Sequence, residues 1–152
     1  MYEIERKFLV KSKKWKPSDN GIKIIQGYLS DDPARTIRVR IADDKAFLTI
    51  KGKSEGIKRS ELEYEIPVDD AQVLMRMVLN KPVEKTRYKQ NYQGFTWEID
   101  VFEGENRGLL LAEIELEYES QMFERPSWAE EEVSEKKQYY NSYLSKKPYC
   151  TW

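Results

Sequence analysis

Apolar and polar residues alternate along most of the chain, and this alternation predicts a mainly antiparallel β protein. Successive side chains of a strand point to opposite faces, so strict alternation is typical of a strand that buries one face. Residues 36–41 follow this pattern, with isoleucine or valine at every second position. Strands are predicted at residues 1–10, 22–29, 36–41, 46–53, 59–66, 83–89, 96–102 and 109–118. The chain therefore has about eight strands, nearly all of them amphipathic.

Two segments break this period of two and predict helices. Asp69 and Asp70 suit a helix start, and residues 71–79 then place an apolar stripe on one helical face. A second helix is expected at residues 136–145, with the acidic residues 130–132 as signals for its start. Its packing face would consist of Tyr139, Tyr140, Tyr143 and Leu144.

The polar faces of the predicted strands carry charged side chains and few neutral polar ones. Basic neighbours that share a face are Arg38 and Arg40, Lys51 and Lys53, and Lys85 and Arg87. Acidic neighbours that share a face are Glu3 and Glu5, Glu61 and Glu63, Glu98 and Asp100, and Glu113 and Glu115. If the sheet closes, these faces line a wet tunnel while the apolar faces pack outward against the helices.

This charge pattern has a simpler alternative, a flat sheet with cross-strand ion pairs. Exposed pairs contribute only about 0–1 kcal/mol each, which is a weak reason for a chain to carry so many. We therefore predict an α+β fold, mainly antiparallel β, with a closed or nearly closed barrel, a charged lumen and helices packed outside. The final helix either packs against the barrel or closes one end of the tunnel, and the pattern leaves both open.

Length and composition narrow the classes of function. The 152 residues suit a single domain spanning 1–152, and the 26 basic and 27 acidic residues leave a net charge of −1. This balance argues against a general nucleic-acid or membrane-surface binder. The absence of histidine excludes histidine-based zinc sites and catalytic triads. With one cysteine, no signal peptide and no apolar run that could span a bilayer, we expect a cytoplasmic protein.

A tunnel with acidic and basic walls predicts a polyphosphate bound together with a divalent cation. Arginine and lysine side chains grip phosphate oxygens, and arginine often does so with two parallel hydrogen bonds. Carboxylates supply the oxygen ligands that Mg²⁺ prefers. A purely basic tunnel would lack a seat for the metal, and a purely acidic one would repel the substrate.

The charged strands together resemble those of the CYTH superfamily, also called the triphosphate tunnel metalloenzymes. The opening segment 3–7, Glu-Ile-Glu-Arg-Lys, is similar to the Glu-x-Glu-x-Lys signature of this family. Further matching motifs lie at residues 26–29, 38–40, 48–52, 59–64, 85–88, 97–102 and 112–116. The resemblance implies an eight-stranded antiparallel tunnel, dependence on a divalent metal and triphosphate-bearing substrates. The compact chain, with Trp128, Tyr139 and Leu144 in its tail, looks most like the short bacterial tripolyphosphatase branch.

The same resemblance implies roles for individual charged residues. The implied metal ligands are Glu3, Glu5 and Glu115, with Glu113, Glu61, Glu63, Glu98 and Asp100 as further candidates. The implied phosphate-binding cations are Lys7, Arg38, Arg40, Lys51, Arg59, Lys85 and Arg87. Glu5 and Lys85 are the expected catalytic residues, and Lys85 would assist most directly, through the leaving oxygen.

The expected reaction is in-line attack of a metal-activated water on a terminal phosphorus, with Mg²⁺ or Mn²⁺ as the cofactor. Inorganic tripolyphosphate is the expected substrate, and phosphate and pyrophosphate are the expected products. A class IV adenylate cyclase would use the same walls, with a ribose hydroxyl as the nucleophile in place of water. A non-catalytic module that binds polyphosphate or a nucleotide is the third reading, and the sequence is compatible with a homodimer.

Overall fold

The computed structural model describes all 152 residues, which form nine strands and two short helices. The strands are β1 (Tyr2–Val10), β2 (Ile22–Asp32), β3 (Arg35–Ala42), β4 (Lys45–Gly52), β5 (Lys58–Ile66), β6 (Val83–Tyr92), β7 (Phe95–Phe102), β8 (Leu110–Glu115) and β9 (Ala129–Glu132). The helices are α1 (Val68–Met75) and α2 (Asn141–Lys146), and 3-10 turns lie at Gly104–Asn106, Lys137–Tyr139 and Tyr149–Thr151.

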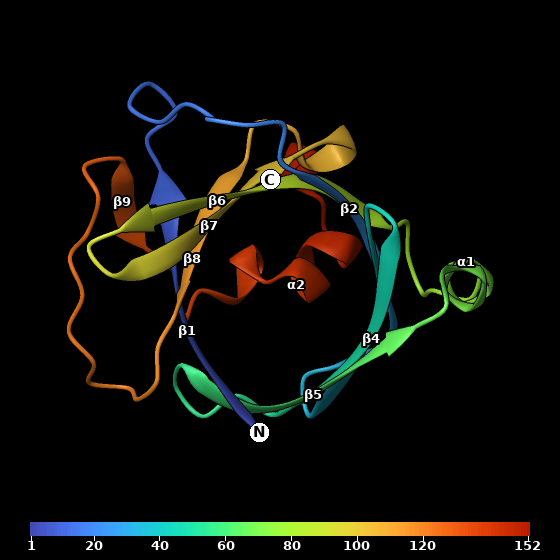
Figure 1. Cartoon of the computed structure of the whole chain (residues 1–152). Coiled ribbons are helices and arrows are strands. Elements are labelled where there is room, and N and C mark those ends of the chain that lie inside the picture. The colour runs from blue at the N-terminus through green and yellow to red at the C-terminus, as the bar shows by residue number, and fades with distance from the viewer.

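The strands β1 to β8 close into an antiparallel ring (Figure 1). Their order is β5-β4-β3-β2-β6-β7-β8-β1, and β1 returns to pair with β5. The closed barrel that the sequence predicts is therefore confirmed. Because the ring is closed, each strand has an inward and an outward face, and the alternation along the strand decides which side chains reach the interior.

Two tight hairpins help to keep neighbouring strands of the ring in register. Asp43, between β3 and β4, has a φ of 52°, and Gln93 and Gly94, between β6 and β7, have φ values of 48° and 82°. Gln93 and Gly94 have the two positive φ values of a type I′ turn, which match the twist of the flanking strands, whereas in the other turn only Asp43 has a positive φ.

Strand β1 changes its partner partway along one edge. Its first residues pair with β5, Glu3 opposite Arg59, whereas its last residues pair with β9, Phe8 opposite Glu132. Residues 130–132 were expected to start a helix, and this expectation is wrong. Because β1 leaves β5 after Ile4, its edge near Phe8 would expose unpaired backbone groups, and β9 pairs with them.

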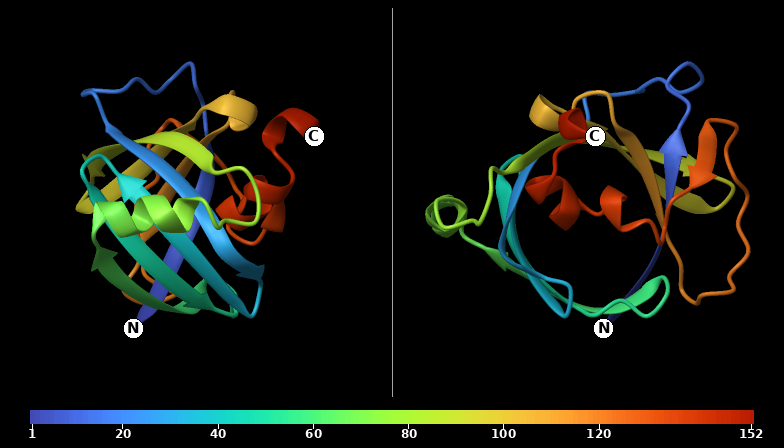
Figure 2. Two further views of the ribbon diagram at one scale, coloured as in Figure 1. Left: turned by 90° about the vertical axis from the view of Figure 1, so that its right-hand side faces the viewer. Right: turned by 180° about the vertical axis from the view of Figure 1, so that it is seen from behind.

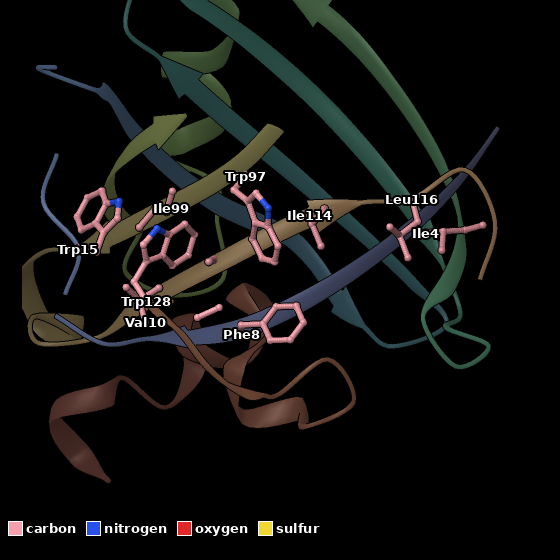
Figure 3. Packing of buried hydrophobic residues seen from close by; sticks show 11 residues of the cluster. Ile4, Phe8, Val10, Trp15, Trp97, Ile99, Ile114, Leu116 and Trp128 are labelled. Carbon is pink, nitrogen blue, oxygen red and sulfur yellow. The ribbon is translucent and has the colours of Figure 1, made fainter. Parts of the chain in front are cut away.

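The outward faces form the main apolar core on one side of the ring (Figure 3). Phe8, Trp97 and Ile114 from three strands are almost fully buried there. Trp15 and Trp128 cover them from coil segments, and the rings of Trp97 and Trp128 lie 5.5 Å apart. Irregular chain, and not a helix as expected, thus covers this side of the barrel.

Helix α1 covers the opposite side of the ring, as predicted for the first helix. Its Ala71 packs with Val39 of β3 and Ala46 of β4. The helix begins at Val68, three residues earlier than the predicted start, because Pro67 with its φ of −59° precedes it directly. It ends at Met75, where the next N–H groups bond to the carbonyls of the last turn.

The C-terminal segment lies across one end of the ring and not on its outside (Figures 1 and 2). The predicted helix 136–145 is divided into a 3-10 turn and α2 by Tyr140, whose ψ of 138° is extended. Leu144 of α2 is fully buried against an apolar cluster of Val83, Phe102, Leu109, Leu111 and Val133. The prediction that helices pack outside therefore holds for α1 and is wrong for α2, because the inward strand faces are apolar at this end. No helix has the length and hydrophobicity needed to cross a membrane.

Candidate functional site

A cavity of about 300 Å³ lies inside the ring, and its walls are almost entirely polar. Only 3 of its 24 lining residues are hydrophobic, so the interior is a charged hollow and not a packed core. Charged residues that the sequence analysis singled out line it as follows: Glu3, Glu5, Lys7, Arg38, Arg40, Lys51, Arg59, Glu61, Glu63, Lys85, Arg87, Glu98, Glu113 and Glu115. Of the predicted site residues, Asp100 alone lies off the cavity wall.

Other lining residues were not predicted as part of the site. Thr36 and Thr49 share the strand faces of Arg38 and Lys51, so the alternation itself could have identified them. Tyr140, Asn141 and Ser142 reach the cavity from the C-terminal segment. No local pattern marks these three residues, because only the fold shows that their segment crosses the end of the ring.

The acidic wall of the cavity centres on Glu3, Glu5 and Glu113. Glu3 accepts hydrogen bonds from Lys51 Nζ at 3.0 and 2.9 Å, and burial, which raises the pKa of Glu3, is outweighed by Lys51, which lowers it. The pKa of Glu5 lies well above its ordinary value because of burial and of repulsion by Glu113 and Glu3. Glu113 is also buried, but Lys7, Arg87 and a hydrogen bond from Glu5 hold its pKa well below its ordinary value. Burial and the mutual repulsion of these carboxyls thus disfavour a negative charge on Glu5, whereas Glu3 and Glu113 are stabilised as carboxylates by nearby cations.

The remaining cavity carboxylates are more dispersed. Glu61 lies 3.4 Å from Lys51, Glu63 lies 3.5 Å from Arg38, and Glu98 lies 3.4 Å from Arg87. Glu115 makes no ion pair, and burial, Glu3 and Glu98 raise its pKa. No three acidic side chains converge into a ready-made metal cage. A metal ion in this cavity would therefore need oxygen ligands from another bound molecule as well as from the protein.

Asp100 lies behind the cavity wall and anchors two cations. Its Oδ2 atom is 2.8 Å from Lys85 Nζ, and its two oxygens accept hydrogen bonds from Arg87 at 2.7 and 2.9 Å. Burial raises the pKa of Asp100, but the two cations lower it to about 2. Burial also lowers the pKa of Lys85, to about 7, although Asp100 acts in the opposite direction. Both oxygens of Asp100 are engaged by these cations, and unlike the other implied metal ligands it does not line the cavity.

Two cations of the cavity, Arg40 and Arg59, have no carboxylate partner. Arg40 donates to the neutral Gln26 at 2.9 Å, and burial together with Arg38 and Arg87 lowers its pKa to about 9. Arg59 donates to the hydroxyls of Ser54 and Thr36, and its buried Nε atom has no partner. Both side chains are partly buried, and a cation removed from water is costly unless a charged partner or a ligand compensates it. A bound anion would compensate the charge of these guanidinium groups.

Comparison with known proteins agrees with this geometry. A family model described as the CYTH domain matches residues 1–148. A protein of Acetivibrio thermocellus named inorganic triphosphatase is 48% identical over 148 residues, which cover 97% of this chain and 95% of that protein. A Nitrosomonas europaea protein of the same name is 37% identical over 151 residues, which cover 95% of this chain and 97% of that one. A crystal structure of an inorganic triphosphatase superposes with a TM-score of 0.67 at 35% identity, covering 94% of this chain and 93% of the other.

Proposed function

The chain belongs to the CYTH domain family, as its motifs predict, and from this membership we propose that it is a metal-dependent hydrolase of inorganic tripolyphosphate. The inorganic triphosphatases described above are similar to it over nearly their whole length, which supports both the enzyme class and the substrate. The products would be phosphate and pyrophosphate.

One structural observation carries this proposal: guanidinium groups without carboxylate partners face the same cavity as an acidic wall with excess charge. Arg40 and Arg59 would bind phosphate oxygens, and Lys51 and Arg87 would add charge from neighbouring walls. A ligand with several adjacent negative charges would compensate all four of these cationic side chains at once. A neutral or singly charged ligand would leave most of them uncompensated.

The carboxylates fit a magnesium ion that is shared with the substrate. Glu3, Glu5, Glu113 and Glu115 offer hard oxygen ligands without competing histidine or cysteine ligands in the wall. The raised pKa of Glu5, caused by burial and by Glu113 and Glu3, marks a position where a cation would relieve the repulsion among the carboxyls. Mg²⁺ commonly uses one or two carboxylates together with substrate phosphates, which agrees with the lack of a ready-made cage. When bound, such an ion supplies Lewis-acid polarisation of the phosphate oxygens.

The chain's own residues would orient the reacting groups. The arginine residues hold the triphosphate so that a water can approach the terminal phosphorus in line with the bridging oxygen. Attack forms a new P–O bond and breaks the bond to the bridging oxygen, which releases pyrophosphate; one proton of the water stays on the phosphate product and the other passes to solvent. Lys85 donates a hydrogen bond toward the leaving oxygen, where negative charge develops.

Phosphate release tests this proposal directly. Purified protein is incubated with tripolyphosphate, ATP or thiamine triphosphate, each with Mg²⁺ and with EDTA. We expect phosphate from tripolyphosphate at the highest kcat/KM, and none in EDTA. Release of cyclic AMP from ATP would instead identify a cyclase, and the absence of every product would identify a binding module.

A further inference from the structure

Lys85 is held from two sides, by Asp100 of β7 and by Asn141 of the C-terminal segment. Its Nζ atom lies 2.8 Å from Asp100 Oδ2 and 3.0 Å from Asn141 Oδ1, and its side chain is fully buried. An ammonium group has three N–H donors and no acceptor, so the amide oxygen of Asn141 must face it. Two of the three donors are therefore fixed by the protein. The third is left for the cavity, which Lys85 also lines.

Asn141 accepts this hydrogen bond without adding charge to the site. Lys85 already shares Asp100 with Arg87. A second carboxylate at position 141 would further neutralise the lysine and would face a triply or more highly charged substrate. An amide oxygen fixes the direction of Nζ and leaves the positive charge available for the guest.

A hydrogen bond to a fixed acceptor is needed to orient Nζ, because the methylene chain of lysine is flexible. Four rotatable bonds separate its backbone from Nζ, and Glu113 also attracts the ammonium group electrostatically. The same C-terminal segment touches a second lysine: Lys7 Nζ donates to the Tyr139 carbonyl at 3.2 Å and lies 5.6 Å from the centre of the Tyr140 ring. Residues 139–141 thus contact two cations that come from different strands.

We propose that Asn141 is a positioning residue, which aims the Lys85 ammonium group at the leaving oxygen of the bound triphosphate. This inference rests on the proposed function, because Lys85 has that role only when a triphosphate occupies the cavity. The C-terminal segment that closes the ring would then contribute to turnover as well as to folding.

A double-mutant cycle tests whether Asn141 acts through Lys85. Asn141→Leu, which is similar in size but has no acceptor, should lower kcat about tenfold and change KM by less than about twofold. Lys85→Ala should lower kcat about a hundredfold or more, and adding Asn141→Leu to it should change kcat by less than about twofold. Gln138→Ala, an exposed change in the same segment, should leave both constants unchanged.

Asn141→Asp separates hydrogen bonding from charge. This variant keeps an acceptor for Lys85, so its kcat should lie closer to that of the wild type than the kcat of Asn141→Leu does. Its added negative charge should raise KM for tripolyphosphate. An equal loss of kcat from Asn141→Leu with and without Lys85 would overturn the proposal, and so would an unchanged kcat in the single variant.

An NMR measurement that does not depend on turnover distinguishes the positioning role of Asn141 from the proposed triphosphatase activity. The ¹⁵Nζ resonance of Lys85, identified by its loss in Lys85→Ala, should shift in Asn141→Leu and stay unchanged in Gln138→Ala. An unchanged resonance in Asn141→Leu would overturn the positioning contact, whatever the activity. Failure of the wild-type protein to release phosphate would instead overturn the proposed function.

Discussion

Glu5 lies on the acidic wall of the cavity, between the carboxyls of Glu3 and Glu113, whose charges repel its own. Burial and this repulsion raise the pKa of Glu5 well above its ordinary value. A divalent cation in the cavity would offset the repulsion and favour the carboxylate form of Glu5. We therefore expect a substitution of Glu5 to affect both metal binding and catalysis.

Glu5→Gln should abolish metal-dependent turnover and leave the free energy of unfolding without metal nearly unchanged. Glutamine imitates a neutral Glu5, the form that the raised pKa favours in the metal-free protein, but it lacks the negative charge of a carboxylate metal ligand. The rate of phosphate release against Mg²⁺ concentration and a urea unfolding curve measure the two effects. Glu65→Gln, on an exposed position of the same sheet, serves as the control; unchanged turnover in Glu5→Gln would remove Glu5 from the site.

Most residues of the site could be predicted because a strand's alternation fixes which side chains share a face. Glu3, Glu5 and Lys7 fall two apart, as do Arg38 and Arg40, and the closed ring turns all of them inward. The partners of each charge could not be predicted, because they depend on the register between strands and on distant segments. Asp100 illustrates this limit: it lies on the expected face, but its oxygens are occupied by two cations from β6.

At the scale of elements, β9 shows how tertiary structure can override local sequence. Its residues, Ala129–Glu132, have no alternation of apolar and polar side chains, so no pattern predicts a strand there. The segment is extended because β1 presents an unpaired edge to it, and because Arg6 of β1 holds Glu132 with bonds of 2.9 and 2.6 Å. The hydrogen bond from Arg6, and a smaller one from Ser134, hold the pKa of Glu132 below its ordinary value.

Glu132→Gln should lower the free energy of unfolding by about 1 kcal/mol at neutral pH, because the Arg6 pair is bidentate but partly exposed. The carboxylate's contribution is fully present above its ordinary pKa of 4.5, and it is lost as the pH falls through the lowered pKa of the folded state. Urea unfolding at several pH values measures this difference between variant and wild type, which should disappear in acid. Glu131→Gln, whose pair with Lys136 is more exposed, should have a smaller effect; a difference that does not depend on pH would contradict the electrostatic explanation.

The protein is a barrel with a charged cavity, and the C-terminal segment closes one end of this barrel. Its stability comes from apolar clusters on the outside of the barrel and at the closed end. The outward core in Figure 3 supports the strands on one side, and α1 supports them on the other. At one end of the ring, the inward faces become apolar, and Leu144 docks against them. The sequence left this closure as one of two alternatives, because the tyrosines and leucine of the last helix fit an outer packing face equally well.

Leu144→Ala should lower the free energy of unfolding by about 2–5 kcal/mol, since the side chain is fully buried in an apolar cluster. Because α2 carries Asn141, the same change should also lower kcat for tripolyphosphate. Urea unfolding and phosphate release measure the two effects. Leu79→Ala, whose side chain is 53% exposed, should change both much less; a Leu144→Ala protein as stable as the wild type would contradict the docking of α2.

A crystal structure of the protein soaked with tripolyphosphate and Mg²⁺ tests most directly whether tripolyphosphate binds inside the ring of strands. We expect electron density for the anion within the cavity, with oxygens on Arg40 and Lys85 and with an ion between the anion and the carboxyls of Glu3 and Glu5. Density for tripolyphosphate only on the outer surface, with the cavity unchanged at saturating ligand, would contradict a substrate site within the ring.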